Sequence, residues 1–178
     1  MIDEKILYYI ERTVEHIRRV QDNMIYLYIF HQDKFDISPD DWRLCLECVM
    51  RHDYSKFNEI QFLPYANYSW SIKFKIPIMA KEKKEFNLAC QDHFRKENHH
   101  PNANQNLYTC TTNEAVEIAC DLQAMAQEFG EDSGRTYFEK TWKKNNSQYF
   151  YDDYNWICSE AIIRKCFDCF DNRKRVKP

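Results

Sequence analysis

Glycine is almost missing from this chain: its 178 residues include only two, Gly130 and Gly134. Sheet-rich folds need many tight turns in which a residue takes a positive φ, and glycine does so without strain. The phosphate-binding loops of common nucleotide-binding folds also need several glycines close together. The scarcity of glycine therefore argues against both and favours helices.

Length and composition favour one domain with a packed interior. Hydrophobic residues make up 44% of the chain, which is enough to bury a core that needs no disulfide bonds or structural metal ions for stability. The formal net charge is −3, with acidic and basic residues mixed along most of the chain. This balance argues against a protein that binds the phosphate backbone of nucleic acid. We predict one helical metal-binding domain over residues 1–171 and a basic, solvated tail over residues 172–178.

The chain also predicts where the protein is found. The first five residues include Asp3 and Glu4, and no small-residue cleavage site follows an apolar run, so we expect no signal peptide. The apolar stretches are too short and too interrupted to span a bilayer. We therefore expect a cytoplasmic protein that does not enter a membrane, with its eight cysteines reduced.

Apolar residues recur at helical spacing through most of the chain. The pattern predicts helices over about residues 3–30, 39–52, 78–98 and 112–129, with two more around residues 137–142 and 156–170. We expect a short helix and a loop over residues 55–70, because Pro64 interrupts this stretch, and an extended segment over residues 73–77. Together these elements predict an all-α domain of about six or seven helices.

Local signals mark several helix ends. Ser38 and Pro39 are typical of a helix start, and Thr111 with Glu114 resembles a capping box. Gly130 is a natural stop for the helix that begins after Thr111. The helix after Ser38 has one apolar face, which we expect to turn inward, and its next step is His52. That face comprises Leu44, Cys45, Cys48 and Val49.

Histidines and aspartates occupy inward or terminal positions on several of these helices. In chain order they are His16, His52, Asp53, His93, His99, His100 and Asp121. Imidazoles and carboxylates together suit Mn, Zn, Fe, Co, Ni or Mg, among which the sequence does not discriminate, and a carboxylate can bridge two ions. A helical bundle can bring such positions together in its core. The series therefore predicts a site for one or two divalent ions.

This order of residues resembles that of the HD superfamily of metal-dependent phosphohydrolases. Arg51–Phe57 is similar to the His-Asp-x-Gly-Lys stretch of HD-type phosphodiesterases, with Ser55 where that pattern has Gly. The chain up to about Lys144 resembles a family of short HD-like proteins common in phages and bacteria. Besides Arg51–Tyr68, the segments that carry the resemblance are Glu15–Ile17, Asn98–Pro101 and Asp121–Lys140.

The resemblance implies a role for each matching residue. His16, His52, Asp53 and Asp121 would hold a first ion, and Asp53 would bridge to a second. His93 and one of His99 or His100, with His100 preferred, would complete the second site. Asp53 and Lys56 would be the catalytic residues, because Lys56 matches the lysine that contacts the scissile phosphate.

The implied activity is hydrolysis of a phosphate monoester or diester. The expected partner is a small phosphorylated substrate, most simply a nucleotide, and two ions could polarise it and generate hydroxide. One alternative is an HD-type di-iron oxygenase, which has nearly the same ligands. Another is a non-catalytic module of phage origin that binds a nucleotide or a host protein. A phage protein would act in the host cytoplasm.

Three further features have two interpretations each. The pairs Cys45/Cys48 and Cys166/Cys169 have zinc-site spacing, but inside amphipathic helices they fit core cysteines better. An aromatic cluster could stack a base or pack beneath a loop, and four basic residues could bind phosphate or simply face solvent. The aromatic cluster is Phe62, Tyr65, Tyr68 and Trp70, and the basic residues are Arg95, Lys96, Arg135 and Lys140.

Overall fold

The computed structural model describes residues 3–97, 99–100, 110–131, 133–142 and 154–173. These residues form helices and connecting turns, and none of them lies in a strand, so the all-α prediction is confirmed. In chain order the elements are α1 (Glu4–His31), η1 (Gln32–Lys34), α2 (Pro39–Met50), η2 (Tyr54–Phe57), α3 (Phe62–Phe74), α4 (Ala80–Lys96), α5 (Thr112–Phe129), α6 (Gly134–Tyr137), the π-helical turn η3 (Phe138–Trp142) and α8 (Tyr154–Arg173).

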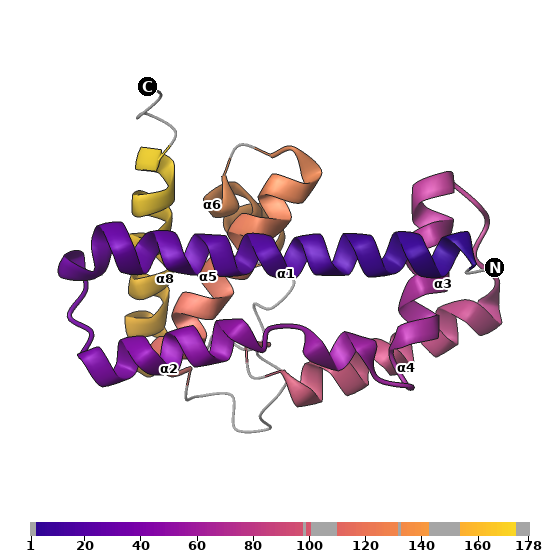
Figure 1. Ribbon diagram of the computed structural model, residues 1–178, viewed down its shortest axis with the longest axis horizontal. Helices are drawn as coiled ribbons and strands as arrows, with labels where there is room; N and C mark the ends of the chain where they lie inside the picture. Colours follow the sequence, from indigo (N-terminus) through magenta and orange to yellow (C-terminus); the bar gives the residue numbers. More distant parts are fainter. Residues whose placement is uncertain (1–2, 98, 101–109, 132, 143–153, 174–178) are drawn as a thin grey trace.

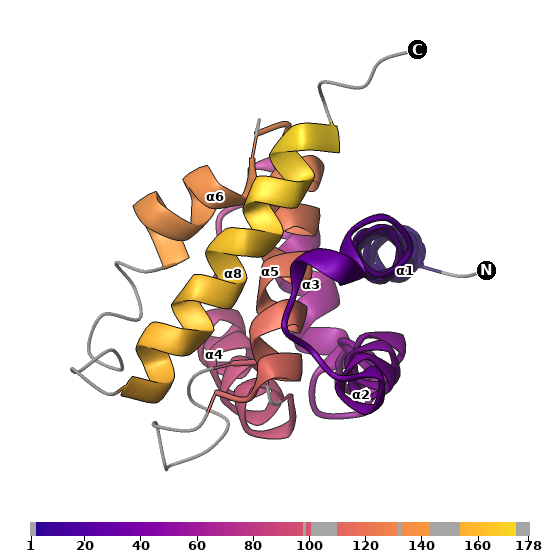
Figure 2. The same ribbon diagram turned by 90° about the vertical axis from the view of Figure 1, so that its left-hand side faces the viewer.

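Helix α5 is the centre of the fold. It contacts α1, α2, α6 and α8. Helix α1 runs along the long axis of the molecule, with α2 beside one half of it and α3 and α4 near its beginning (Figure 1). Seen from the end, α5 lies between α8 on one side and α1 and α2 on the other (Figure 2). A residue on α5 can therefore meet residues from both ends of the chain.

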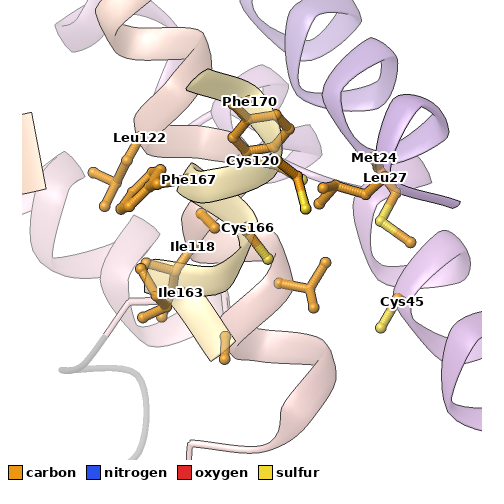
Figure 3. Packing of buried hydrophobic residues seen from close by; sticks show 14 of the residues in the cluster. Met24, Leu27, Cys45, Ile118, Cys120, Leu122, Ile163, Cys166, Phe167 and Phe170 are labelled. Atoms are coloured by element: carbon orange, nitrogen blue, oxygen red, sulfur yellow. The ribbon is translucent and has the colours of Figure 1, made fainter. Parts of the chain in front are cut away.

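The apolar core lies where α5 packs against α8, α1 and α2 (Figure 3). Leu122 of α5, Phe167 of α8 and Met24 of α1 are fully buried in it. Burying a side chain of this size stabilises the fold by about 1.5–3 kcal/mol. This core packs α5 against the long α1, and both helices continue from it into a polar cluster.

The helix ends follow the signals in the sequence. Ser38 caps α2 by accepting a hydrogen bond from the backbone N–H of Asp41 at 3.1 Å, and Pro39 is the first residue of that helix. Thr111 and Glu114 form a capping box at the start of α5. Gly130 ends α5 with a φ of 69°, which glycine adopts without strain.

Other local predictions were wrong. Pro64 does not break a helix, because it lies in the first turn of α3, where its missing N–H has no partner within the helix anyway. Lys73 and Phe74 continue α3 rather than starting an extended segment. On α2, Leu44 is 41% exposed, and Trp42 is buried instead, because it packs edge-on against Phe35.

The cysteines of the two CxxC pairs belong to the apolar interior. Cys45, Cys166 and Cys169 are buried, and Cys48 is half-buried. Burial raises the pKa of Cys45 to about 12, so its thiol stays neutral. Among the described residues, no group of potential metal ligands includes a cysteine. The interpretation of these residues as core cysteines fits the fold.

The last described helix extends into the predicted tail, and no described helix could cross a membrane. Helix α8 includes Asn172 and Arg173, and the guanidinium of Arg173 lies 4.6 Å from the ring centre of Tyr26. The remaining tail, residues 174–178, lies outside the described residues. Within the described part of the chain, every helix is too short or too polar to cross a membrane.

Candidate metal centre

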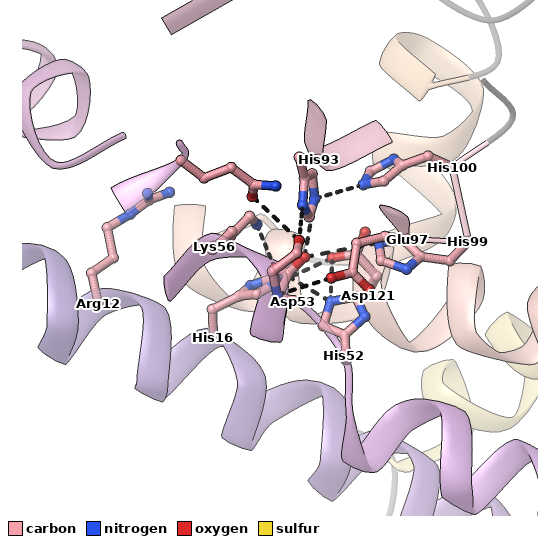
Figure 4. A network of polar contacts seen from close by, with 12 residues as sticks. Arg12, His16, His52, Asp53, Lys56, His93, Glu97, His99, His100 and Asp121 are labelled. Atoms are coloured by element: carbon pink, nitrogen blue, oxygen red, sulfur yellow. Dashed lines mark hydrogen bonds and ion pairs between the residues drawn. The ribbon is translucent and has the colours of Figure 1, made fainter. Parts of the chain in front are cut away.

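Seven residues predicted as metal ligands come together in one cluster (Figure 4). They lie on five segments: α1, the turn after α2, the end of α4, residues 99–100, and α5. Most are buried, and His100 and Asp121 are half-buried. In the same order these residues are His16, His52 with Asp53, His93, His99 with His100, and Asp121.

Asp53 lies at the centre of the cluster. Its φ of 61° is in the left-handed region, which aspartate tolerates better than most residues and which often marks functional sites. Its Oδ2 lies 3.5 Å from the Nε2 atoms of both His16 and His52. Its Oδ1 lies 3.2 Å from His93 Nε2 and 3.9 Å from His99 Nε2. The two oxygens of one carboxylate therefore face two different sets of imidazoles.

The first set consists of His16, His52 and Asp121. Asp121 Oδ1 lies 3.1 Å from His16 Nε2 and 3.7 Å from His52 Nε2. Ligand atoms that are each about 2.0–2.2 Å from a shared ion lie roughly 3–3.6 Å apart. With Asp53 Oδ2, these atoms have the spacing of a four-ligand site.

The second set consists of Asp53, His93, His99 and His100, whose ligand atoms all lie within 4.8 Å of one another. His93 Nε2 and His100 Nε2 are only 2.9 Å apart. We expected one of His99 and His100 to join this set, but both are present. His99 is the more buried of the two.

Several atoms at the centre lack the hydrogen bonds that buried polar atoms normally make. His52 Nε2, His99 Nε2 and Asp53 Oδ1 are buried without a hydrogen-bond partner. Such atoms are rare in folded proteins and call for an explanation, such as an ion. All three face the same small region, and nitrogen and carboxylate oxygen are the ligands that divalent transition metals prefer. The residues present therefore fit a metal centre.

Neighbouring charges shift the pKa values of the side chains at the centre. Burial alone would raise the pKa of Asp53, but Lys56 and His52 outweigh it and hold that pKa well below its usual range. Burial would lower the pKa of His52, but Asp53, Asp121 and Glu117 raise it well above its usual range. Burial lowers the pKa of His100, as do His99 and His93. His100 is therefore a neutral imidazole, the form that binds metals.

The residues behind the ligands were not predicted from the sequence. Glu117 Oε1 lies 3.0 Å from His52 Nδ1 and 3.2 Å from His99 Nδ1. The hydrogen bond with His52 and the nearby imidazole of His99 outweigh burial and hold the pKa of Glu117 at about 2. Its position four residues before Asp121, on the same face of α5, was a signal that could have identified it.

His93 also has a hydrogen-bond partner at Nδ1, and a carboxylate lies farther from Nδ1 of His16. Ser55 Oγ lies 2.9 Å from His93 Nδ1, and Glu128 Oε2 lies 3.7 Å from His16 Nδ1. Ser55 is the residue that replaces glycine in the motif. Each of these rings thus directs Nε2 inward and Nδ1 outward, as in metal sites where an outer residue orients the ligand.

A cavity of about 230 Å³ opens beside the first set, lined by His16 and Lys56 among others. The ammonium of Lys56 donates a hydrogen bond to Asp53 Oδ2 and lies 5.8 Å from the ring centre of Tyr65. A larger cavity of about 640 Å³ adjoins it, and both include Arg12 and Tyr68 in their walls. The centre is therefore accessible from one side.

The predicted aromatic and basic residues divide between this cavity and other places. Of the aromatic cluster, Tyr65 and Tyr68 line the cavity, while Phe62 packs against Tyr9 and Trp70 against Tyr8 and Phe74. The basic residues with described partners are neutralised elsewhere. Arg95 and Lys96 pair with Asp92, and Arg135 pairs with Asp168 and Asp171.

Comparison with known proteins places the chain in a family without assigning an activity. Residues 5–165 match a family of unknown function, DUF5662. No curated protein and no solved structure matches the chain. Because the match covers most of its length, the chain belongs to the DUF5662 family.

Proposed function

We propose that the protein is a metal-dependent phosphohydrolase that acts on a nucleotide or a similar small phosphate ester. The observation that carries the proposal is the position of Asp53, whose two oxygens face two sets of imidazoles. A bridging carboxylate between two ions is typical of centres that hydrolyse phosphate esters. The resemblance to the HD superfamily supports the same activity.

The ligand sets assign residues to two ions. His16, His52, Asp121 and Asp53 Oδ2 would hold one, and Asp53 Oδ1 with three histidines would hold the other. Bound divalent ions would supply the Lewis acidity that polarises a phosphate ester and lowers the pKa of water. The nitrogen-rich donor set favours manganese, iron, cobalt, nickel or zinc over magnesium.

Lys56 would bind a phosphate oxygen of the substrate. Its side chain is 21% exposed, and it lines the cavity while contacting the bridging carboxylate. A fixed positive charge at this place stabilises the negative charge that develops on the phosphoryl oxygens in the transition state. In HD-type phosphodiesterases the matching lysine contacts the scissile phosphate.

The cavity walls suit the remainder of a nucleotide. Tyr65 and Tyr68 present aromatic surface, and Arg12, which is paired with Glu128, lies where the inner and outer cavities meet. Pockets for small molecules commonly have volumes of about 300–1,000 Å³, and the outer cavity falls within this range. Nucleotides are abundant in the cytoplasm, which is the location we propose.

The test is metal analysis of the purified protein, followed by assays on a panel of nucleotides with manganese, cobalt or magnesium. We expect bound metal and the release of phosphate or a nucleoside monophosphate. In Asp53→Asn we expect both the metal and the hydrolysis to be lost. A protein that holds no metal and hydrolyses nothing with any added ion would refute the proposal. Iron with a mixed-valence electron resonance signal would instead indicate oxygenase chemistry.

Loss of the centre separates catalysis from simple binding. The double variant His52→Ala, Asp53→Ala removes the bridging carboxylate and one ligand of the first set. If this variant kept full biological activity, the protein would be a binding module rather than an enzyme. We expect the activity to be lost while the helical fold, measured by circular dichroism, remains.

A further inference from the structure

One buried carboxylate contacts both halves of the metal centre. Glu117 is 4% exposed and lies on α5, one turn before Asp121. Its Oε1 is 3.0 Å from Nδ1 of His52, which belongs to the first set, and 3.2 Å from Nδ1 of His99, which belongs to the second. A single oxygen atom thus links a ligand from each set.

The chemistry of imidazole gives this contact a direction. A neutral histidine carries one proton, so a ring that binds an ion through Nε2 carries its proton on Nδ1 and needs an acceptor there. The Nε2 atoms of His52 and His99 are buried and have no hydrogen-bond partner. A carboxylate that accepts from Nδ1 holds the ring orientation and makes Nε2 a stronger ligand.

The same three side chains could also be considered an ion site of their own, since their ligand atoms lie within 4.8 Å of one another. An ion there would take the lone pair of Nδ1 on both rings and move the protons to Nε2. His52 and His99 would then direct N–H groups at the other ligands and leave both sets. His52 favours the first arrangement, because its Nδ1 is hydrogen-bonded to Glu117 while its Nε2 has no partner.

We propose that Glu117 is a positioning residue shared by the two ion sites, which orients His52 and His99 and strengthens both sites together. This role rests on the metal centre of the proposed function and is independent of the reaction. Glu128 provides the contrast, because it is half-buried on α5, pairs with Arg12 and approaches one histidine alone, at 3.7 Å from His16 Nδ1.

The experiment compares Glu117→Gln with Glu128→Gln in the full-length protein. Each is stripped of metal and titrated with Mn²⁺ and with Co²⁺, by calorimetry and by the visible spectrum of cobalt. For Glu117→Gln we expect both ion affinities to fall, each by about 10–100-fold, the usual effect of losing an outer partner of a ligand. For Glu128→Gln we expect one affinity to fall and the other to stay at the wild-type value.

The readouts separate the possible failures. Thermal unfolding of the metal-free variants checks the fold, and Glu117→Asp, which keeps the charge, is expected to retain more affinity than Glu117→Gln. Unchanged affinities in Glu117→Gln, or weakening of one site only, would overturn the proposal. So would three ions in the wild type with one lost in the variant, or no ion in the wild type. Two bound ions without hydrolysis would refute the proposed function and leave the role of Glu117 intact.

Discussion

Lys56 donates a hydrogen bond to Asp53 Oδ2, the oxygen that also lies 3.5 Å from the Nε2 atoms of two histidines. The two residues are three positions apart in the chain. Because η2 begins directly after Asp53, it turns the lysine back over the carboxylate. Without an ion, the ammonium is the nearest positive charge to that oxygen. A bound ion would take its place and free Lys56 for the substrate.

Replacing Lys56 with methionine tests this relationship. Lys56→Met keeps most of the side-chain volume and removes the charge, so we expect hydrolysis to fall by about 10²–10³-fold. Ion affinity should be unchanged or higher, because the competing ammonium is gone. Lys81→Met is the matched control, since Lys81 is 84% exposed at the beginning of α4. A loss of metal together with activity would instead make Lys56 structural.

The bridging role of Asp53 predicts a difference between two aspartates. Asp53→Asn should weaken both ion sites, because its two oxygens face different sets. Asp121→Asn should weaken the first site alone, because Asp121 belongs only to that set. Metal content after dialysis against a defined free ion concentration measures the difference. Equal losses in both variants would contradict the bridge.

The metal-free protein should lose stability in acid. The pKa of Glu117 is about 2 in the fold against an ordinary value of 4.5, so its ionised form stabilises the fold above pH 4.5. That stabilisation is lost as the pH falls from 4.5 towards 2. The lowered pKa values of Asp53 and Asp121 act in the same direction.

Urea unfolding at several pH values, with a chelator present, measures this effect. Glu117→Gln removes one of the three carboxylates, so its free energy of unfolding should depend less steeply on pH below 4.5 than that of the wild type. Parallel pH curves for the two proteins would show that the fold does not lower the pKa of Glu117.

The two glycines predict different costs of substitution. A Cβ at Gly134 would lie 2.8 Å from backbone atoms of Gln123 and from a ring carbon of Phe167, so we expect Gly134→Ala to destabilise the fold by about 1–3 kcal/mol. Gly130 has open space around it, and its positive φ alone should cost about 1 kcal/mol in Gly130→Ala. Urea unfolding of both variants, at neutral pH, compares them.

The buried thiols should be unreactive in the folded protein. Burial raises the pKa of Cys45 to about 12 and that of Cys166 well above its usual range. We expect neither to react with iodoacetamide at pH 8 until the protein is unfolded, because the thiolate is the reactive form. Mass spectrometry of peptides after alkylation locates the modified residues, and rapid labelling of Cys45 in the native state would contradict the packing.

Much of the fold was predictable because it depends on neighbours in the chain. The helix caps depend on residues only a few positions apart, so they can be predicted from the sequence. Examples are the caps at Ser38 and Thr111 and the helix end at Gly130. The inward direction of His52 and His93 also followed from the spacing of apolar residues along the helix that precedes or holds each of them. Pro64 misled the prediction because a proline has opposite effects in the first turn and in the interior of a helix.

The sequence by itself determined that the chain is helical, with very little glycine for turns. It also determined that histidines and aspartates occupy inward positions, in an order that resembles that of the HD superfamily. Only the tertiary structure decided how those positions meet. Periodicity sets the face on which a side chain lies, but the distance between faces depends on how α5 packs against α1 and α2. That packing places Glu117 beside His52, and the residues after α4 bring His99 and His100 into one set, which no spacing along the chain records.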